Sequence, residues 1–235
     1  MAIIDELSVR QRLTWVAHLW KALTQQHHRE MRTLFRPLLP ADGVVLDIGG
    51  HSGQFSKLFA AMVPDGAVHT FEPGSYALSL LRRVVAFRGL RNVTIHPCGL
   101  GDAERTLNLI VPVKRSGSVG FGLSFVGDAS AEKRAVLVEP ISIRRLDDMA
   151  DELALARVDL IKADIEGSEL RMLVGAERAL RRFRPALFLE ISPAHLARHG
   201  DSVKAMTDFL RDLGYRPVEG WGEQQIGGDV LLIAD

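Results

Sequence analysis

Ten residues near the start of the chain, LDIGGHSGQF at 46–55, constrain the fold more than any other stretch. A short apolar run ends at Asp47, and Gly49, Gly50 and Gly53 follow before a helical pattern begins. Glycine permits the tight backbone turn that joins a strand to a helix beside a bound ligand. The stretch therefore predicts a strand, a glycine turn and a helix that together hold a nucleotide-like cofactor.

Short apolar runs recur after this turn and alternate with helical stretches or loops. Six of them have the composition of strands buried on both faces: VVLDI, AVHTF, NVTIH, DLIKADI, ALFLEI and DVLLIA. This alternation predicts a doubly wound, Rossmann-like α/β fold. Among the helices, we expect Ser168 to cap one that carries Leu170, Leu173 and Leu180, and another to stop at Gly214.

Residues 103–145 interrupt the alternation and predict an insertion of short strands and loops over an edge of the sheet. Two interpretations stay open for it. Either it shapes the acceptor pocket, with the loop 116–125 closing over the acceptor through Phe121 and Phe125, or it is a plain surface hairpin.

The N-terminal part has a different pattern and predicts helices from residue 6 to about residue 38. Its apolar residues at helical spacing include Leu13, Val16, Trp20 and Leu23. The pattern favours packing of this stripe on the core over a place for Trp15 and Trp20 in a homodimer interface or a cofactor lid. We therefore divide the chain into an N-terminal helical appendage, 1–42, and a cofactor-binding domain, 43–235.

Composition restricts the partners and the compartment. The 29 basic and 29 acidic residues balance, which gives no electrostatic footprint for nucleic acid. Cys98 is the only cysteine, so intrachain disulfides and a cysteine zinc cluster are excluded. The N-terminus has acids where a signal peptide needs a basic segment, and no uncharged apolar run has the length that spans a bilayer. We expect a cytoplasmic protein with no membrane partner.

The turn also discriminates between cofactors. A dinucleotide turn, G-x-G-x-x-G, would need glycine where Ile48 stands, and the chain instead has a carboxylate, Asp47, at the turn. That carboxylate would repel a pyrophosphate, whereas S-adenosylmethionine has no phosphate and carries an ammonium and a sulfonium cation. Glu72, 19 residues after Gly53, is placed to accept hydrogen bonds from ribose hydroxyls in either case. The turn favours S-adenosylmethionine over the cofactor of an NAD-dependent oxidoreductase.

The most specific segment is LIKADIEGSEL at 160–170. Together with DIGGHSGQFS, FEP, GLGD and FLEIS in the same order, it resembles the FkbM family of S-adenosylmethionine-dependent methyltransferases over roughly residues 43–234. The resemblance implies a class I methyltransferase fold with a seven-stranded, mostly parallel sheet whose last strand is antiparallel. It also implies methyl transfer to a hydroxyl of a small molecule, often a sugar or a polyketide-like natural product. His51 stands where the family more often has asparagine.

These patterns define the predicted site residues. We expect the cofactor to contact Asp47, Gly49, Gly50, Gly53, Glu72, Pro73 and Asp102. The predicted catalytic residues are Lys162, Asp164, Glu190 and His195, and we expect Lys162 to pair with Asp164 or Glu190.

The way in which a hydroxyl acceptor would be activated stays open. Methyl transfer to a hydroxyl needs a base, or a metal that acidifies the hydroxyl. The base is either one of the strand-end carboxylates or His195. Alternatively, Asp164, Glu166 and Glu190 are the oxygen ligands of Mg²⁺. A binding protein that keeps the fold without catalysis is the remaining alternative.

Overall fold

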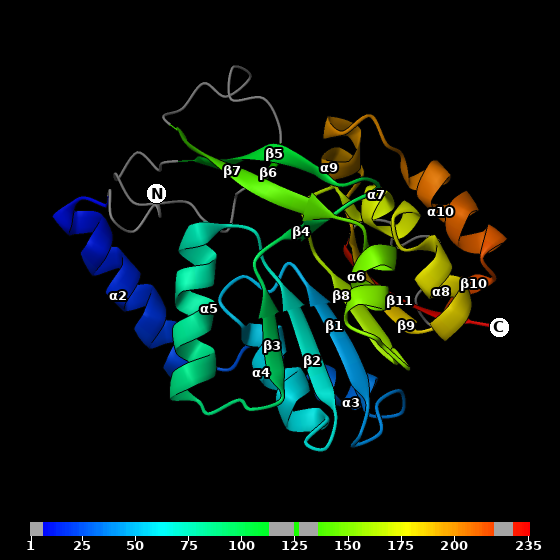
Figure 1. The fold of residues 1–235 in the computed structure, drawn as a ribbon, viewed down its shortest axis with the longest axis horizontal. Coiled ribbons are helices and arrows are strands. Elements are labelled where there is room, and N and C mark those ends of the chain that lie inside the picture. The colour runs from blue at the N-terminus through cyan, green and yellow to red at the C-terminus, as the bar shows by residue number, and fades with distance from the viewer. Residues whose placement is uncertain (1–6, 113–124, 127–135, 219–227) are drawn as a thin grey trace.

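The computed structural model describes residues 7–112, 125–126, 136–218 and 228–235, and its main layer is a seven-stranded sheet. The strand order is β10-β11-β9-β8-β1-β2-β3 (Figure 1). The strands are β1 (Val44–Ile48), β2 (Ala67–Phe71), β3 (Val93–His96), β8 (Leu160–Ala163), β9 (Ala186–Ile191), β10 (Tyr215–Pro217) and β11 (Gly228–Ala234). Strands β3, β2, β1, β8 and β9 are parallel, whereas β11 is antiparallel to β9 and to β10. The predicted fold class is confirmed, and the last strand is antiparallel as the resemblance implied.

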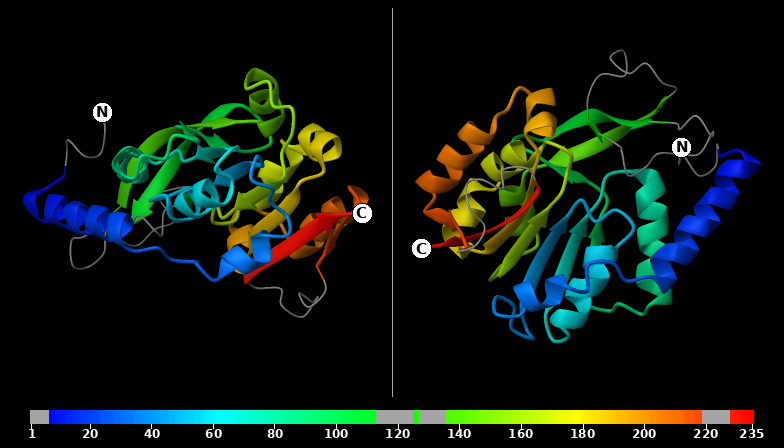
Figure 2. Two further views of the ribbon diagram at one scale, coloured as in Figure 1. Left: turned by 90° about the horizontal axis from the view of Figure 1, so that it is seen from below. Right: turned by 180° about the vertical axis from the view of Figure 1, so that it is seen from behind.

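Helices cover both faces of this sheet. They are α2 (Val9–Thr24), α3 (Met31–Phe35), α4 (Gln54–Met62), α5 (Ser75–Phe87), α6 (Leu146–Glu152), α7 (Glu169–Val174), α8 (Glu177–Phe183), α9 (Pro193–Arg198) and α10 (Val203–Asp212). Alternate residues of β1 point to opposite faces. Val45 packs in one core cluster with residues of α3 and α4, and Leu46 packs in another with residues of α6, α7, α8 and α10. The sheet is therefore the middle of three layers (Figure 2).

The insertion forms a second, four-stranded sheet together with β4, which directly precedes it, in the order β4-β7-β5-β6. Its strands are β4 (Gly99–Leu100), β5 (Arg105–Pro112), β6 (Phe125–Val126) and β7 (Val136–Arg144). Figure 1 shows this sheet above the carboxyl ends of β1, β2 and β3. The predicted short strands are thus present. Residues 116–124, which include Phe121 of the predicted lid, lie outside the described residues, as does the side chain of Phe125.

Helix α2 lies beside α5 at one edge of the molecule (Figures 1 and 2). The indole Nε1 of Trp15 donates to Ser79 Oγ at 2.8 Å, and His18 Nδ1 lies 3.0 Å from the Tyr76 hydroxyl. The face with these two residues meets α5, so the predicted stripe does not. The prediction that Leu13, Val16 and Trp20 pack on the core is wrong, because all three are exposed.

Helix α3 is packed more deeply than α2. Phe35 and Leu39 are buried in one cluster with Val45 and Phe59, so this part of the predicted appendage shares the core of the sheet. The domain boundary at residues 42 and 43 stays a sequence-based prediction.

The predicted helix after Ser168 is two helices, α7 and α8, separated at Gly175. A Cβ atom at Gly175 would lie 1.9 Å from the carbonyl oxygen of Gly101, so the chain turns where it touches that loop. The expected side-chain cap at Ser168 is also wrong, because Ser168 makes no capping hydrogen bond. Glu169, the first residue of α7, instead holds the turn before the helix: its Oε1 accepts from the N–H groups of Ile165 and Gly167. Gly214 ends α10 as predicted, with a φ of 76°.

Candidate active site

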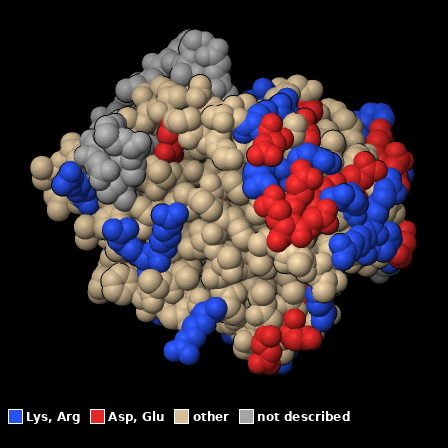
Figure 3. Space-filling model, in the orientation of Figure 1, with Lys and Arg blue, Asp and Glu red and all other residues tan. Residues whose placement is uncertain are grey.

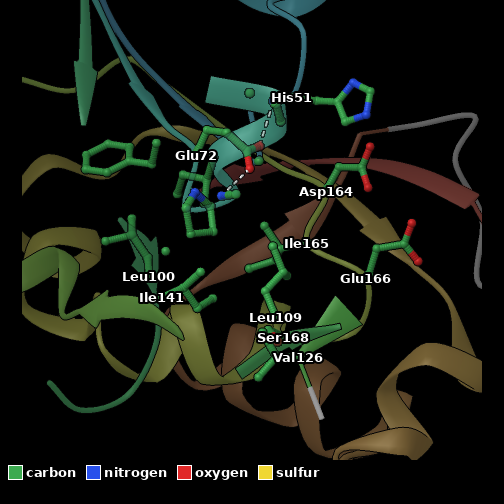
Figure 4. A pocket seen from close by; sticks show the side chains of 18 of the residues that line it. His51, Glu72, Leu100, Leu109, Val126, Ile141, Asp164, Ile165, Glu166 and Ser168 are labelled. Atoms are coloured by element: carbon green, nitrogen blue, oxygen red, sulfur yellow. Dashed lines mark hydrogen bonds between the residues drawn. The ribbon is translucent and has the colours of Figure 1, made fainter. Parts of the chain in front are cut away.

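A cavity of about 340 Å³ lies at the carboxyl ends of β1, β2 and β8, where ligands bind in open α/β sheets. Its polar side presents His51, Asp164 and Glu166, and its other side presents Leu100 and Ile141 (Figure 4). The apolar wall comes from the second sheet, because the insertion strands β5, β6 and β7 and the preceding strand β4 each contribute a residue to it: Leu109, Val126, Ile141 and Leu100. The insertion therefore shapes the cavity and is more than a surface hairpin.

The glycine turn after β1 forms part of the cavity wall through Gly49 and Gly50. Gly49 has a φ of 76°, and a Cβ there would lie 2.1 Å from the carbonyl oxygen of Asp164. A Cβ at Gly50 would lie 2.1 Å from Thr70 Cγ2. These glycines are required because the turn touches the chain after β8 and strand β2. The turn is thereby fixed against both neighbouring strands.

Asp47 lies beneath this turn and is fully buried. Its Oδ2 accepts a hydrogen bond from Ser56 Oγ at 2.6 Å, and its Oδ1 has no hydrogen-bond partner. Asp47 is absent from the residues that line the cavity. Its influence on a cofactor therefore passes through the position and the charge of the turn above it.

Lys162 is the cation that accompanies Asp47. Its Nζ lies 3.6 Å from Asp47 Oδ1 and 4.0 Å from Asp164 Oδ2, and it donates to the carbonyl oxygens of Ile48 and Gly49 at 3.4 and 3.1 Å. The predicted pairing with Asp164 is the longer of the two contacts. Asp47 is nearer because β1 and β8 are adjacent and their register places Asp47 opposite Lys162.

Glu72 lines the cavity directly after β2 and is buried. Its Oε2 accepts from the His51 N–H at 2.9 Å and its Oε1 accepts from the Gly74 N–H at 2.8 Å (Figure 4). Burial raises the pKa of Glu72 to about 7 against the lowering effect of these two hydrogen bonds. A carboxylate has about four acceptor sites, so it can also accept from two hydroxyls of a ribose.

Three cavity residues have an unusual backbone conformation. His28, His51 and Glu166 have φ values of 62°, 50° and 56°, and all three line the cavity. Side chains other than glycine rarely adopt such values, and they concentrate at functional sites. Burial lowers the pKa of His51 to about 4, with a further lowering by Lys162, so its imidazole is neutral at pH 7.

A group of acids lies at the polar end of the cavity, after β8 and on β9. The carboxyl of Glu190 is within hydrogen-bonding reach of Asp164, and burial together with that carboxylate raises the pKa of Glu190 to about 8. Burial also raises the pKa of Glu166. His195 lies behind Glu166, with its Nδ1 3.2 Å from Glu166 Oε2 and 3.9 Å from Glu190 Oε2. The strands of Asp164 and Glu190 are neighbours, as predicted.

The backbone explains why His195 reaches this group. Gly167 has a φ of 104°, and a Cβ there would lie 2.3 Å from the carbonyl oxygen of His195. The turn after β8 therefore packs directly against α9. His195 and Glu190 contact the acids but are absent from the cavity wall, whereas Asp164, Glu166 and Lys162 are part of it.

Of the remaining predicted residues, some line the cavity and others do not. Pro73 lines the cavity beside Glu72. Gly53 is the N-cap of α4 and lies outside the cavity wall, and Asp102, also outside it, pairs with Arg105. For the predicted Mg²⁺ ligands Asp164, Glu166 and Glu190 the structure offers no support, because the described residues include no group of three His, Cys, Asp or Glu side chains placed to hold a metal ion.

The contribution of His28 to the cavity wall was not predicted. His28 lines it and stacks on Phe55 with ring centroids 4.6 Å apart. The segment before His28 is held to α4, because Lys57 Nζ donates to the carbonyl oxygens of Ala22 and Gln25 at the end of α2. A cation at a helix C-terminus is favourable. No motif spacing connects residue 28 with the glycine turn, so only the fold reveals this contact.

The cavity fits S-adenosylmethionine. Glu72 can accept hydrogen bonds from a ribose, the apolar wall can accommodate a purine, and the glycine turn above the buried Asp47 is where a cationic amino-acid part would lie. The fold and the site together define a class I methyltransferase. The chain belongs to the FkbM methyltransferase family, because the model of the methyltransferase FkbM domain matches residues 47–217. S-adenosylmethionine is the cofactor that this family implies, and the NAD-dependent alternative is set aside.

Comparisons with known proteins agree with this assignment. The AMB antimetabolite synthetase AmbE of Pseudomonas aeruginosa is 28% identical over 227 residues, which cover 83% of this chain and 10% of that protein. The 2-O-methyltransferase NoeI of Sinorhizobium fredii is 28% identical over 245 residues, covering 96% of this chain and 93% of NoeI. The crystal structure of a methyltransferase FkbM from Methylobacillus flagellatus shares the fold, with a TM-score of 0.55, 22% identity, and coverage of 84% of this chain and 45% of that one. This chain thus spans only a small part of AmbE and less than half of the solved chain.

The described helices were compared with the length and composition of a membrane-spanning helix. Across the described ranges, no helix combines the length and the apolar composition needed to cross a bilayer.

Proposed function

We propose that this methyltransferase transfers the methyl group of S-adenosylmethionine to a hydroxyl of a small molecule, such as a sugar or a natural-product scaffold. The observation that supports the proposal is that Glu72 and Asp164 line the same cavity, with Asp164 at its polar end. The name of the relative NoeI, a 2-O-methyltransferase that this chain covers almost completely, supports oxygen as the methylated atom. The absence of a nucleic-acid partner stays a prediction from the balanced charge.

Asp164 is the residue we assign to the acceptor hydroxyl. Its side chain is about half exposed and lines the cavity, so it can contact an acceptor that the buried Asp47 cannot reach. When bound, S-adenosylmethionine supplies an electrophilic methyl group on its sulfonium. Asp164 then accepts the proton that the hydroxyl loses as its oxygen gains the methyl group.

The neighbours of Asp164 act through it. Glu190, with its pKa raised to about 8, is mostly protonated at pH 7 and donates toward the Asp164 carboxylate. Lys162 Nζ lies 4.0 Å from Asp164 on the side of the glycine turn. His195 contacts Glu166 and is assigned a positioning role, since it does not line the cavity.

Labelled cofactor tests the proposal. The protein is incubated with S-adenosylmethionine carrying a ¹³C methyl group and with a set of monosaccharides, cyclic polyols and hydroxylated macrolides. We expect nuclear magnetic resonance to place the label on an oxygen of the accepted compound. A label on nitrogen or carbon, or on an added RNA alone, would overturn the proposal. No transfer to any hydroxyl compound, with the cofactor bound, would favour a binding protein without catalysis.

The role of Asp164 has its own test. Asp164→Asn should keep cofactor binding and reduce turnover by a factor of about 10² or more, as expected for a lost base. The control Asp208→Asn changes a half-exposed acid on α10, outside the cavity, and should leave turnover unchanged. Turnover of Asp164→Asn at the wild-type rate would remove Asp164 from the mechanism. Loss of wild-type turnover in a chelator, with recovery on adding Mg²⁺, would assign these acids to a metal instead.

A further inference from the structure

Helix α2 exposes a continuous apolar stripe that nothing in the methyl-transfer site uses. Its members are among the most exposed large apolar side chains of the described residues: Val9 at 78%, Leu13 at 68%, Val16 at 56% and Trp20 at 70%. Single exposed apolar residues are ordinary, but an aligned row of them marks an interaction site.

The spacing of the stripe has a specific meaning. The steps from Val9 to Trp20 are four, three and four residues, which is the alternation of positions a and d in a heptad repeat. At 3.6 residues per turn, these side chains fall within an arc of roughly 60° on the helix. Leu23 continues the pattern and is half-buried. A narrow seam of this kind packs against another helix, whereas a helix that enters a lipid surface presents a wider apolar face.

The surroundings of the seam are basic. Arg10 and Lys21 flank it on one side and Arg12 on the other, and all three are exposed. The chain has no acidic residue between Glu6 and Glu30. On the face drawn in Figure 3, the charged side chains over the α2 and α5 side are mostly basic, whereas basic and acidic side chains mix closely on the opposite side.

The neighbouring helix extends this charge. Residues 73–101, which include α5, contain no acid and four arginines: Arg82, Arg83, Arg88 and Arg91. All four are exposed. The guanidinium of Arg83 lies over the Trp15 ring at 4.7 Å, so α5 brings its charge directly to the flank of α2. The apolar seam therefore lies in a surface that favours a negatively charged partner.

We propose that α2 is the docking site for an amphipathic helix of a partner protein, apolar along one seam and acidic along both edges of that seam. A second copy of this chain fits less well, because a two-fold contact would join two basic edges and α2 itself, Val9–Thr24, contains no acid to pair them. One helix of 16 residues is about 24 Å long, and its seam is short. We therefore expect a reversible complex of the small, transient class.

Two synthetic helical peptides test the proposal. Each has three heptads with leucine at positions a and d; one carries glutamate along the edges of its seam and the other carries lysine. Like charges keep each peptide from pairing with itself at neutral pH. Fluorescence anisotropy with the full chain should show binding of the glutamate peptide and binding at least about tenfold weaker of the lysine peptide. Added salt should weaken the complex.

Variants on exposed positions locate the contact. Leu13→Glu should abolish binding, and Arg10→Glu combined with Lys21→Glu should reverse the preference toward the lysine peptide. Val174→Glu, on α7, replaces another exposed apolar residue and should bind like the wild type. Circular dichroism checks that each variant is folded. Methyl transfer should be unchanged in all three, since none of these residues lines the cavity.

Four results would overturn the proposal. The glutamate peptide fails to bind, or both peptides bind equally well. A dimer of the protein, seen by sedimentation velocity and lost in Leu13→Glu, assigns the seam to a second copy. Sedimentation with phosphatidylglycerol vesicles, also lost in Leu13→Glu, assigns it to a membrane surface.

Discussion

Lys162 Nζ lies 3.6 Å from Asp47 Oδ1, and neither residue is exposed to solvent by more than a few per cent. The pair joins two adjacent strands directly beneath the glycine turn. Because Lys162 Nζ is also 4.0 Å from Asp164 Oδ2, one ammonium group lies between the turn predicted to hold the cofactor and the acid proposed to contact the acceptor. Loss of this ion pair should therefore shift both the glycine turn and Asp164.

Lys162→Met should destabilise the protein strongly. Removing one partner of a buried ion pair leaves the other charge uncompensated and costs about 3–5 kcal/mol. Urea unfolding measures the change. The matched control is Lys204→Met, which breaks the exposed pair with Asp208 and should cost less than about 1 kcal/mol. Equal losses in the free energy of unfolding for the two variants would show that the buried pair stabilises the protein no more than the exposed pair does.

The raised pKa of Glu190 predicts a pH dependence of stability. The ordinary glutamate value is 4.5 and the folded value is about 8, so between them the native state binds more protons than the unfolded state. Stability contributed by this group is present below about pH 4.5 and is lost as the pH rises through about 8. Glu72 contributes in the same direction. Glu190→Gln should therefore flatten the fall in melting temperature between about pH 5 and about pH 9.

The half-exposed Glu177, on α8, provides the control for this measurement. Glu177→Gln should leave the slope of melting temperature against pH as in the wild type. A Glu190→Gln profile parallel to the wild type would contradict the assignment of Glu190 as a protonated neighbour of Asp164.

Gly49→Ala should damage both the fold and cofactor binding. Gly49 and Gly200 have nearly the same φ, 76° and 78°, but a Cβ at Gly49 meets the Asp164 carbonyl oxygen whereas a Cβ at Gly200 has no atom within 4 Å. Gly200→Ala should therefore cost about 1–2 kcal/mol of backbone strain alone. Gly49→Ala should cost about 1–3 kcal/mol more, because the turn must move. Similar unfolding energies for the two variants would show that the contact with Asp164 is easily relaxed.

Much of the fold could be predicted because the strands of a covered parallel sheet are short apolar runs. All six predicted runs are strands, from VVLDI at β1 to DVLLIA at β11. The strand β10 was missed because Tyr215–Pro217 is only three residues and contains Arg216 and a proline. The short helices α6 and α9 were missed, since seven and six residues give too little periodicity to detect.

The site was less predictable, because it depends on which elements are neighbours. The motif spacing located Glu72 and Asp164, and both line the cavity. The pairing of Lys162 with Asp47 follows from the order of strands β8 and β1, which no local pattern encodes. Likewise, the periodicity of α2 correctly predicts a helix but does not tell which face α5 covers.

Binding of S-adenosylmethionine to Glu72→Gln, measured by titration calorimetry, tests the central claim most directly. The wild type should bind S-adenosylmethionine and give no heat with NAD. At about pH 8, above the pKa of Glu72, the Glu72→Gln variant should lose about 1.5–3 kcal/mol, roughly 10- to 100-fold in affinity, because a hydrogen bond to a charged group is lost. The control Glu104→Gln changes an exposed acid outside the cavity and should bind like the wild type. Binding of NAD, or full wild-type affinity in a folded Glu72→Gln variant, would contradict the account.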